Sequence, residues 1–491
     1  MRNFLVISIF NLMAVACSHA PSSEPKTSVE LNDIHSQLNS TIHESIKAPK
    51  TVEEIQAVIR QAKKDKKAIS ISGGKHSMGG QQFGAGTQHI SMSAFNQVIG
   101  LDSEKGILEV QSGIQWPELV DWLNQNQKSS KRPWGIRQKQ TGADRLSIGG
   151  ALSSNIHGRG LKMRPMIDDV ESFTLIDADG EIKTCSRSEN QELFKLVIGG
   201  YGLFGVIGTV KVRLMPVQIL ERVVKIIEIK DFIPLVTQRA NEGYLFGDFQ
   251  FAIDPKSNDF MNRGVYSLYK PVQKEMKSGS EISEMKADDW GRLIGLAHQD
   301  KSRAFQIYTQ FYLGTNGQLY RSDTHQMGVY VDDYHKSFDN GVKASEMISE
   351  IYVPRDKLKK LFDQLRVDFR KNETNVVYGT VRLIEKDNES FLAWAKQSYA
   401  ATVFNFHVDH TPVGIEKAKM QFQHIIDRAL EHEGSYFLTY HRWARKDQVL
   451  KAYPQMPKFL ELKRKYDPEE RFQSDWYRHY KEMFNATATA Q

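Results

Sequence analysis

The alternation of apolar and polar residues predicts an α+β chain with many short strands in its first half. Thr51 fits a helix N-cap, and apolar residues then recur at helical spacing from Ile55 to Ala62. The basic run 63–67 closes this helix favourably, because cations stabilise a helix C-terminus. Period-two patterns and turn residues then predict strands at 68–72, 89–92, 106–111, 172–176 and 181–184.

The pattern changes near residue 217, where strands and helices become longer and aromatic residues more frequent. Residues from about 448 onward are helical in pattern and end in a short Ala/Thr tail. We therefore expect one domain over 46–217, a second over 218–447 and a C-terminal segment over 448–485.

The N-terminus has the pattern of an export signal. A short positive start precedes the apolar run 4–16, which is too short for a mature membrane helix and indicates a signal peptide over 1–16. Small residues before Cys17 resemble a bacterial lipobox, although Ala14 stands where leucine is usual. Cleavage after Ala16 or Ala20 is the alternative. We expect residues 17–45 to be a tether and N-terminal arm, and the protein to be exported, periplasmic or membrane-anchored through Cys17.

Composition excludes several classes of function. The net charge of +6 over 491 residues is spread along the chain, which is not the footprint of a nucleic-acid partner. Cys17 and Cys185 are the two cysteines, so lipidation of Cys17 leaves neither a disulfide nor a cysteine metal site. The pair His407-x-x-His410 lacks a third ligand pattern, and we expect no metal there.

The strongest chemical pattern is the loop 72–81, which holds four glycines and follows a predicted strand directly. Such a loop turns tightly and brings backbone N–H groups close to an anion, so it suits a pyrophosphate. An ordinary glycine-rich turn is the alternative. A second segment, 142–160, pairs glycines with small hydroxyl residues and would form a flat wall for a planar ring system. Close helix packing would explain that segment equally well.

A third glycine pattern, Gly200-Tyr201-Gly202-Leu203-Phe204-Gly205, matches GxGxxG formally. A dinucleotide fingerprint of the Rossmann type needs a strand before it and a helix after it. The sequence predicts the reverse order, a helix over 192–198 and a strand over 206–214. We therefore reject NAD binding by this motif.

In this order, the three glycine segments resemble the FAD-binding domain of the vanillyl-alcohol oxidase superfamily. The resemblance implies a two-subdomain, PCMH-type FAD-binding domain, followed by a substrate (cap) domain with a large antiparallel sheet and flanking helices, and a last segment that returns to the FAD domain. In that family His76 would carry FAD covalently on its imidazole. The cofactor-binding residues implied by the resemblance are Gly73, Gly74, Lys75, His76, Ser77, Gly79, Gly80, Gln81, Gly142, Ser147, Gly149, Gly150, Ser153, Ser154, His157, Gly158, Gly205, Val206 and Ile207.

The C-terminal half resembles the branch that contains alditol, gulonolactone and arabinonolactone oxidases. Thr380-Val381-Arg382 stands at the place of its E-x-R motif, and residues 440–445 resemble its H-W-x-K segment. The sequence departs from the family where Lys75 replaces a glycine, where Thr380 replaces the acid, and where Arg442 occupies the place of the family histidine. No cysteine lies near Ser153 for a second covalent bond.

The resemblance implies an FAD-dependent oxidation of an alcohol carbon on a small, polar, carbohydrate-like substrate, with hydride passing to flavin N5 and electrons to oxygen or another acceptor. We expect Arg382 to orient the substrate, His441 to act as base and Arg445 to make a second substrate contact. An ion pair of Arg382 with Glu385 or Asp387 is the alternative for that residue. A dehydrogenase that uses a quinone or carrier protein, and a non-catalytic surface lipoprotein, are the alternatives for the whole chain.

Overall fold

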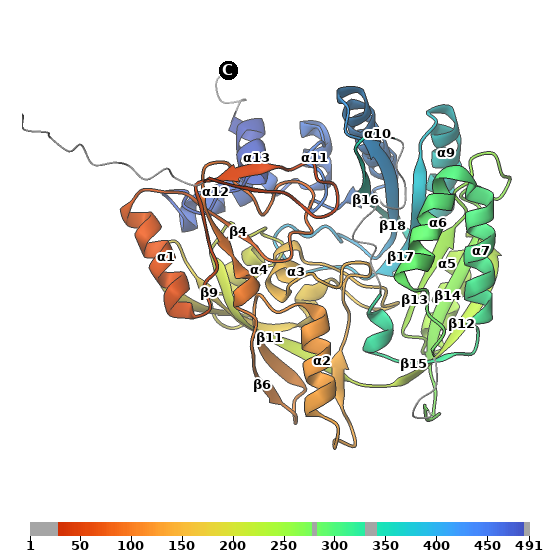
Figure 1. Ribbon diagram of the computed structural model, residues 1–491, viewed down its shortest axis with the longest axis horizontal. Coiled ribbons are helices and arrows are strands. Elements are labelled where there is room, and N and C mark those ends of the chain that lie inside the picture. Colours follow the sequence, from red (N-terminus) through yellow and green to blue (C-terminus); the bar gives the residue numbers. More distant parts are fainter. Residues whose placement is uncertain (1–27, 277–281, 329–340, 486–491) are drawn as a thin grey trace, which may run out of the picture.

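The computed structural model describes residues 28–276, 282–328 and 341–485, and shows an α+β architecture (Figure 1). The expected signal peptide over 1–16 and the lipid attachment at Cys17 lie outside the described residues. Within the described ranges, no helix combines the length and the apolar content that a membrane span requires.

The N-terminal part begins with a small parallel sheet in the order β3-β5-β4, made of β3 (Ser45–Lys47), β5 (Gln88–Ser91) and β4 (Ile69–Ser72). Helix α1 (Val52–Lys64) covers this sheet with Ile55, Ile59 and Ala62, which belong to one buried cluster with Ile69. The hydroxyl of Thr51 accepts a hydrogen bond from the backbone of Glu54 and caps the helix as predicted. The parallel pairing follows from the crossover through α1.

A six-stranded antiparallel sheet forms the rest of the first domain, with the order β10-β9-β11-β7-β6 and β8 paired to β11. The turn between β9 and β10 places Gly180 at a φ of +80°, a left-handed conformation that glycine adopts without strain. The elements are β6 (Val98–Asp102), β7 (Ile107–Gln111), α2 (Trp116–Asn126), β8 (Trp134–Ile136), α3 (Ile148–Ser154), β9 (Val170–Ile176), β10 (Ile182–Ser186), α4 (Gln191–Val197) and β11 (Val206–Pro216).

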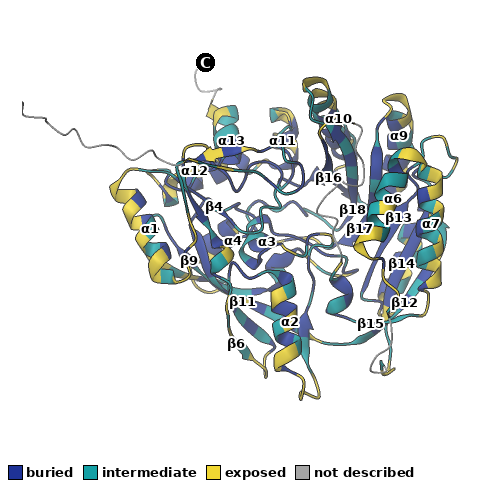
Figure 2. Cartoon of the chain, viewed as in Figure 1, coloured by how far each residue is buried: buried dark blue, intermediate teal, exposed yellow. Residues whose placement is uncertain are grey.

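The second half is built on one eight-stranded antiparallel sheet, in the order β15-β12-β14-β13-β17-β18-β16-β19. Its central strands are buried on both faces (Figure 2). The strands are β12 (Ile219–Glu228), β13 (Phe246–Phe251), β14 (Arg263–Pro271), β15 (Leu319–Arg321), β16 (Ala344–Pro354), β17 (Val376–Ile384), β18 (Tyr399–Asp409) and β19 (Ser435–Tyr436).

The two faces of this sheet differ in chemistry because side chains alternate along each strand. On β13, Phe249 meets Phe232 of α5 (Ile229–Asn241), whereas its neighbours Asp248 and Gln250 point to the other face, toward a cavity. Further along the apolar face lie α9 (Leu358–Lys371) and α10 (Pro412–Glu431), joined by an ion pair between Asp368 and Arg428. On the cavity side lie α6 (Ala287–Gln299) and α7 (Lys301–Gly314).

Both chain ends return to the small sheet. The N-terminal arm forms β1 (Val29–Leu31) and β2 (Thr41–His43), and the C-terminal helices are α11 (Lys446–Ala452), α12 (Met456–Tyr466) and α13 (Asp475–Asn485). Between α12 and α13, Phe472 bridges Ile69 of β4 in parallel, and the Ile69 amide donates to the carbonyl of Arg471 at 2.6 Å. The C-terminal segment thus pairs with β4, at the otherwise open edge of the small parallel sheet.

Replacing Phe472 with alanine tests this closure. Phe472 is fully buried in the cluster that holds α1 and β4, so Phe472→Ala should lower the free energy of unfolding by about 3 kcal/mol. Urea denaturation measures the change. Val413→Ala is the control, because Val413 is 79% exposed and should change stability by less than about 0.5 kcal/mol. Equal effects of the two substitutions would contradict the packing described for the C-terminal segment.

Candidate active site

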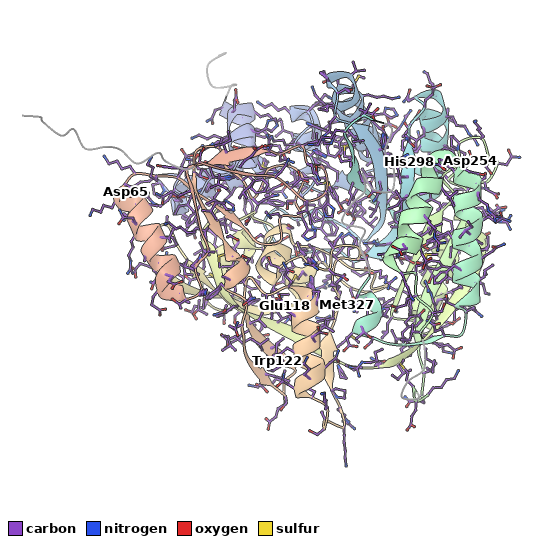
Figure 3. All side chains as sticks on the ribbon, viewed as in Figure 1. Asp65, Glu118, Trp122, Asp254, His298 and Met327 are labelled. Atoms are coloured by element: carbon purple, nitrogen blue, oxygen red, sulfur yellow. The ribbon has the colours of Figure 1, made fainter. Side chains whose placement is uncertain are left out.

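Two adjoining cavities lie where the first domain faces the eight-stranded sheet. They share four lining residues, His76, Ser77, Leu146 and Ser154. The larger cavity has a volume of about 400 Å³ and extends over strands β12 to β18. Side chains fill most of the space that separates the ribbons in Figure 3, where Met327 marks one border of the larger cavity.

The smaller cavity is lined by most of the predicted cofactor residues. Its wall contains one cation, Lys75, and no carboxylate, so its charge and exposed glycine backbone fit a pyrophosphate. Sequence reasoning missed Ser112, Tyr201 and Gly202 in this wall. The predicted residues that line it are Gly73, Gly74, Lys75, His76, Ser77, Gln81, Ser147, Gly149, Gly150, Ser153, Ser154, Gly205, Val206 and Ile207.

The loop 72–81 and helix α3 approach each other too closely for side chains at the glycines. A Cβ on Gly73 would come within 1.9 Å of the Ser147 hydroxyl, and one on Gly74 within 2.3 Å of the Arg145 carbonyl. Lys75 has a φ of +59°, the left-handed conformation that glycine adopts most easily. Lys75, which stands where the family has glycine, is therefore held in a strained backbone conformation.

Five predicted cofactor residues lie elsewhere. Gly142 lines the larger cavity. Gly79 and Gly80 line neither cavity and instead pack against the segment 438–442, where the Arg442 guanidinium donates to the Gly79 carbonyl at 2.8 Å. His157 and Gly158 also line neither cavity, because the loop that follows α3 turns them toward β16 and Lys139.

His76 is held by a residue from the N-terminal arm that sequence reasoning missed. The Nε2 atom of His35 lies 2.8 Å from Nδ1 of His76, and the two rings are tilted at 52°. Burial, together with repulsion from His35, lowers the pKa of His76 to about 3, so its imidazole is neutral at neutral pH. Its other nitrogen, Nε2, is buried without a partner among the described residues.

Arg382 of β17 lines the larger cavity, as expected. Its side chain is 6% exposed, and its Nε and one terminal nitrogen have no hydrogen-bond partner in the described part of the chain. The alternative ion pairs are absent there, because Glu385 is bound to Arg355 and Asp387 to Asn155. Buried donors without partners are costly, so they indicate a bound group that accepts from them.

The structure does not bring His441 and Arg445 to the cavity. His441 is stacked on Trp443 at 4.1 Å between ring centroids, and burial lowers its pKa to about 4. Arg445 lies at the surface and binds Asp427 and Asp447 at the start of α11. Neither residue lines the cavity in which the expected roles as base and second substrate contact would place it. Tyr440, one position before His441, lines the cavity instead.

The remaining wall of the larger cavity combines polar and aromatic groups. Asp248 and Gln250 of β13 each have an oxygen without a partner among the described residues. Glu346 of β16 accepts a hydrogen bond from Asn405, and burial raises its pKa to about 7. The aromatic side of the wall is formed by Tyr269, Trp290, Phe305, Tyr308, Phe311, Tyr312 and Tyr320.

Comparison with known proteins finds two family matches in different parts of the chain. Residues 44–186 match the family described as FAD binding domain, and residues 302–480 match the family described as D-arabinono-1,4-lactone oxidase. The first range contains the loop 72–81 and helix α3, and the second contains Arg382 and Tyr440. The chain belongs to the aldonolactone oxidase branch of the PCMH-type FAD-linked oxidases.

Individual relatives extend this assignment. L-Gulonolactone oxidase of Mus musculus is 22% identical over 439 residues, which is 86% of this oxidase and 92% of the mouse protein. L-Gulonolactone oxidase of Bos taurus is 31% identical over 169 residues, covering 34% of this chain and 36% of the relative. Cytokinin dehydrogenase 2 of Arabidopsis thaliana is 29% identical over 171 residues, covering 34% of this chain and 32% of the plant protein.

The strain at Lys75 gives a stability prediction. Lys75→Gly should raise the free energy of unfolding by up to about 1 kcal/mol, because glycine removes the cost of the left-handed backbone. Lys64→Gly, the same substitution in the last turn of α1, should instead lower it by up to about 1 kcal/mol. Thermal or urea unfolding of both variants checks the opposite signs. A destabilised Lys75→Gly variant would show that the Lys75 side chain contributes more than its backbone costs.

Proposed function

We propose that this oxidase removes hydride from a hydroxyl-bearing carbon of a sugar- or lactone-like substrate and delivers it to N5 of FAD. The observation that supports this proposal is the junction of the two cavities at His76 and Ser154. The glycine-lined cavity suits the dinucleotide, and the larger cavity provides room and polar groups for a polyhydroxylated substrate. The names of the mouse and bovine relatives point to the same substrate class.

Arg382 would orient the substrate in this site. Its two nitrogens without partners can donate to adjacent oxygens of a polyol or lactone through a fixed fork. The same positive charge favours the negative charge that develops when the hydroxyl loses its proton. Asp248 and Gln250 add acceptors for further substrate hydroxyls.

We further propose that FAD is joined covalently to Nε2 of His76. The contact with His35 occupies Nδ1, so the free lone pair lies on Nε2 when Nδ1–H donates to His35. The bond would form between Nε2 and the flavin 8α carbon, with loss of one proton from each partner and transfer of two electrons into the flavin, which oxygen then removes. His35 would hold the ring through its contact with Nδ1.

The N-terminus supports export as a separate proposal. Residues 1–16 have the pattern of a signal peptide, and lipidation at Cys17 would anchor the domain through the tether and N-terminal arm over 17–45. Mass determination of the mature N-terminus checks it: a diacylated Cys17 supports the anchor, whereas an unmodified Cys17 or Pro21 terminus shows plain cleavage.

Anaerobic mixing of the purified oxidase with sugars, polyols and lactones tests the reaction. At least one compound should bleach the flavin absorbance, and Arg382→Lys should slow that bleaching by about 100-fold because a single ammonium cannot replace the fork. Arg428→Lys is the matched control, since Arg428 binds Asp368 on the apolar side of the sheet and should leave bleaching unchanged. Absence of bleaching with every compound would overturn the proposed reaction.

Denaturing gels test the covalent bond. Flavin fluorescence should remain with the unfolded wild-type chain, disappear in His76→Ala, and decrease strongly in His35→Ala, whereas His432→Ala is the control because His432 binds Gln364. Attachment should be equal between about pH 5 and pH 8, because the lowered pKa keeps His76 neutral throughout this range. Full release of flavin from the wild-type chain by acid would exclude the linkage.

A further inference from the structure

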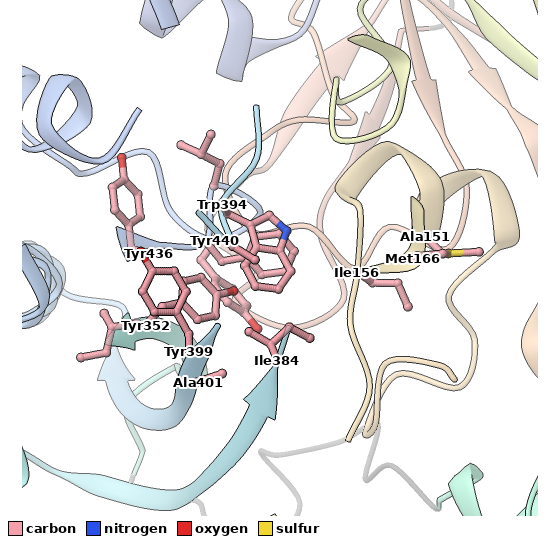
Figure 4. Close-up of a cluster of buried hydrophobic side chains, with 14 of the residues drawn as sticks. Ala151, Ile156, Met166, Tyr352, Ile384, Trp394, Tyr399, Ala401, Tyr436 and Tyr440 are labelled. Carbon is pink, nitrogen blue, oxygen red and sulfur yellow. The ribbon is translucent and has the colours of Figure 1, made fainter. Parts of the chain in front are cut away.

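A buried trio of polar side chains, Glu350, His157 and Tyr440, adjoins the larger cavity, and of these only His157 had an expected role, as a cofactor-binding residue. Glu350 of β16 is 2% exposed, and its Oε1 lies 2.5 Å from Nε2 of the fully buried His157. The hydroxyl of Tyr440 donates to the second carboxyl oxygen, Oε2, at 3.2 Å. Tyr440 lies among the aromatic side chains shown in Figure 4 and lines the cavity.

The hydrogen-bond pattern fixes how many protons this trio holds. Nδ1 of His157 lies 2.9 Å from the carbonyl oxygen of Gly158, and a carbonyl only accepts, so Nδ1 carries a hydrogen. The short contact between Nε2 and Oε1 then requires one more proton, which belongs either to a charged imidazole or to a neutral carboxyl. The pair therefore shares one proton and keeps lone pairs on Oε2 for Tyr440.

Glu350 lies in the same row across the sheet as Thr380, the residue that stands at the acidic position of the E-x-R motif. Gln250, Thr380, Val403 and Glu350 form one row across the neighbouring strands β13, β17, β18 and β16. Directly paired residues share a face of an antiparallel sheet, and Gln250 and Val403 of this row line the cavity. Glu350 is therefore the carboxylate of the row in which Thr380 provides none.

We propose that Tyr440 and Glu350 together accept the proton of the reacting hydroxyl, in place of the acid that Thr380 replaces. This inference rests on the proposed function. The substrate O–H bond breaks toward the Tyr440 oxygen, and Tyr440 passes its own proton to Oε2 of Glu350. The two electrons of the C–H bond leave as hydride to FAD, so the carbon is oxidised to a carbonyl and FAD is reduced. His157 touches neither substrate nor cofactor and is a positioning residue.

Electrostatics around the trio suit this transfer. Burial alone would raise the pKa of the Glu350 carboxyl, but the attraction of His157 outweighs it and holds that pKa below its usual range. Burial and the Glu350 charge raise the pKa of Tyr440 far above its usual value, so its hydroxyl keeps a proton to pass on. Arg382 of β17 acts on both groups, and the other titratable neighbours of Glu350 are Tyr352 and Tyr453.

Removal of the Tyr440 hydroxyl is the central test. Tyr440→Phe keeps the ring and the His157–Glu350 pair but breaks the proton path, so anaerobic flavin bleaching should slow by about 100-fold or more while substrate affinity stays within about threefold. Tyr352→Phe is the matched control, because its buried hydroxyl has no partner among the described residues and its ring stacks on Trp394 in the same cluster. It should bleach at the wild-type rate.

Proton NMR gives a readout that does not depend on turnover. The short His157–Glu350 contact should produce a strongly downfield proton resonance in the wild-type protein and in Tyr440→Phe. Glu350→Gln should abolish this resonance and slow bleaching as much as Tyr440→Phe does. If Glu350→Gln fails to fold, the bleaching rates of Tyr440→Phe and Tyr352→Phe still test the inference.

The pH dependence separates the trio from the other acid in the cavity. Because the pKa of Glu350 is depressed, bleaching should be constant from about pH 8 to pH 5 and fall only as Glu350 is protonated at lower pH. Loss of rate as the pH falls through about 7, together with slow bleaching of Glu346→Gln at every pH, would make Glu346 the acceptor and overturn the inference. If Tyr440→Phe bleaches at the wild-type rate, the inference about Tyr440 and Glu350 is overturned and the proposed function is not affected. If no substrate bleaches the flavin of the wild-type protein, the proposed function is overturned as well.

Discussion

Burial of the loop 155–158 between the two halves of the chain is the constraint on which the site depends. Its polar groups are out of reach of water and must be paired from the opposite half. Asn155 donates to Asp387, its carbonyl accepts from the Trp394 indole, and His157 binds Glu350. These hydrogen bonds contribute about 1 kcal/mol each to holding the halves together. The FAD-binding domain and the large sheet are therefore fixed in position relative to each other, and the cavities lie at the interface between them.

The two faces of the large sheet have different roles, because one packs against helices and the other borders the larger cavity. One face packs against α5 and α9 through phenylalanines, as Phe251 does with Phe362. The other face carries the buried Asp248 and Arg382, which are only partly paired, and the buried Glu350. Such groups reduce stability, and a core selected for stability alone would avoid them. Their concentration on one face, beside a cavity, shows where the fold tolerates that cost for binding and chemistry.

Sequence reasoning recovered the local features and missed the distant contacts. The loop 72–81, the strand before it and the inverted GxGxxG context depend on neighbouring residues, and the structure shows each of them. The contacts His35–His76 and His157–Glu350 join positions 41 and 193 residues apart, which no local pattern reveals. The segment 438–445 has no regular period, so the direction of each side chain depends on tertiary packing, and the sequence does not show that Tyr440 lines the cavity while His441 does not.

The Arg471 guanidinium donates a hydrogen bond to the carbonyl of Ala62, which lies 409 positions earlier in the sequence. Together with the Ile69–Phe472 bridge, this bond ties the C-terminal segment to the first sheet and its helix. A chain emerging from the ribosome makes its cofactor loop early, yet the sheet that supports this loop keeps an open edge until almost the last residues are synthesised. The FAD-binding half is thus not an independent unit of biogenesis. Its completion is a late event, and defects at the carboxyl end of the sequence act on structure at the amino end.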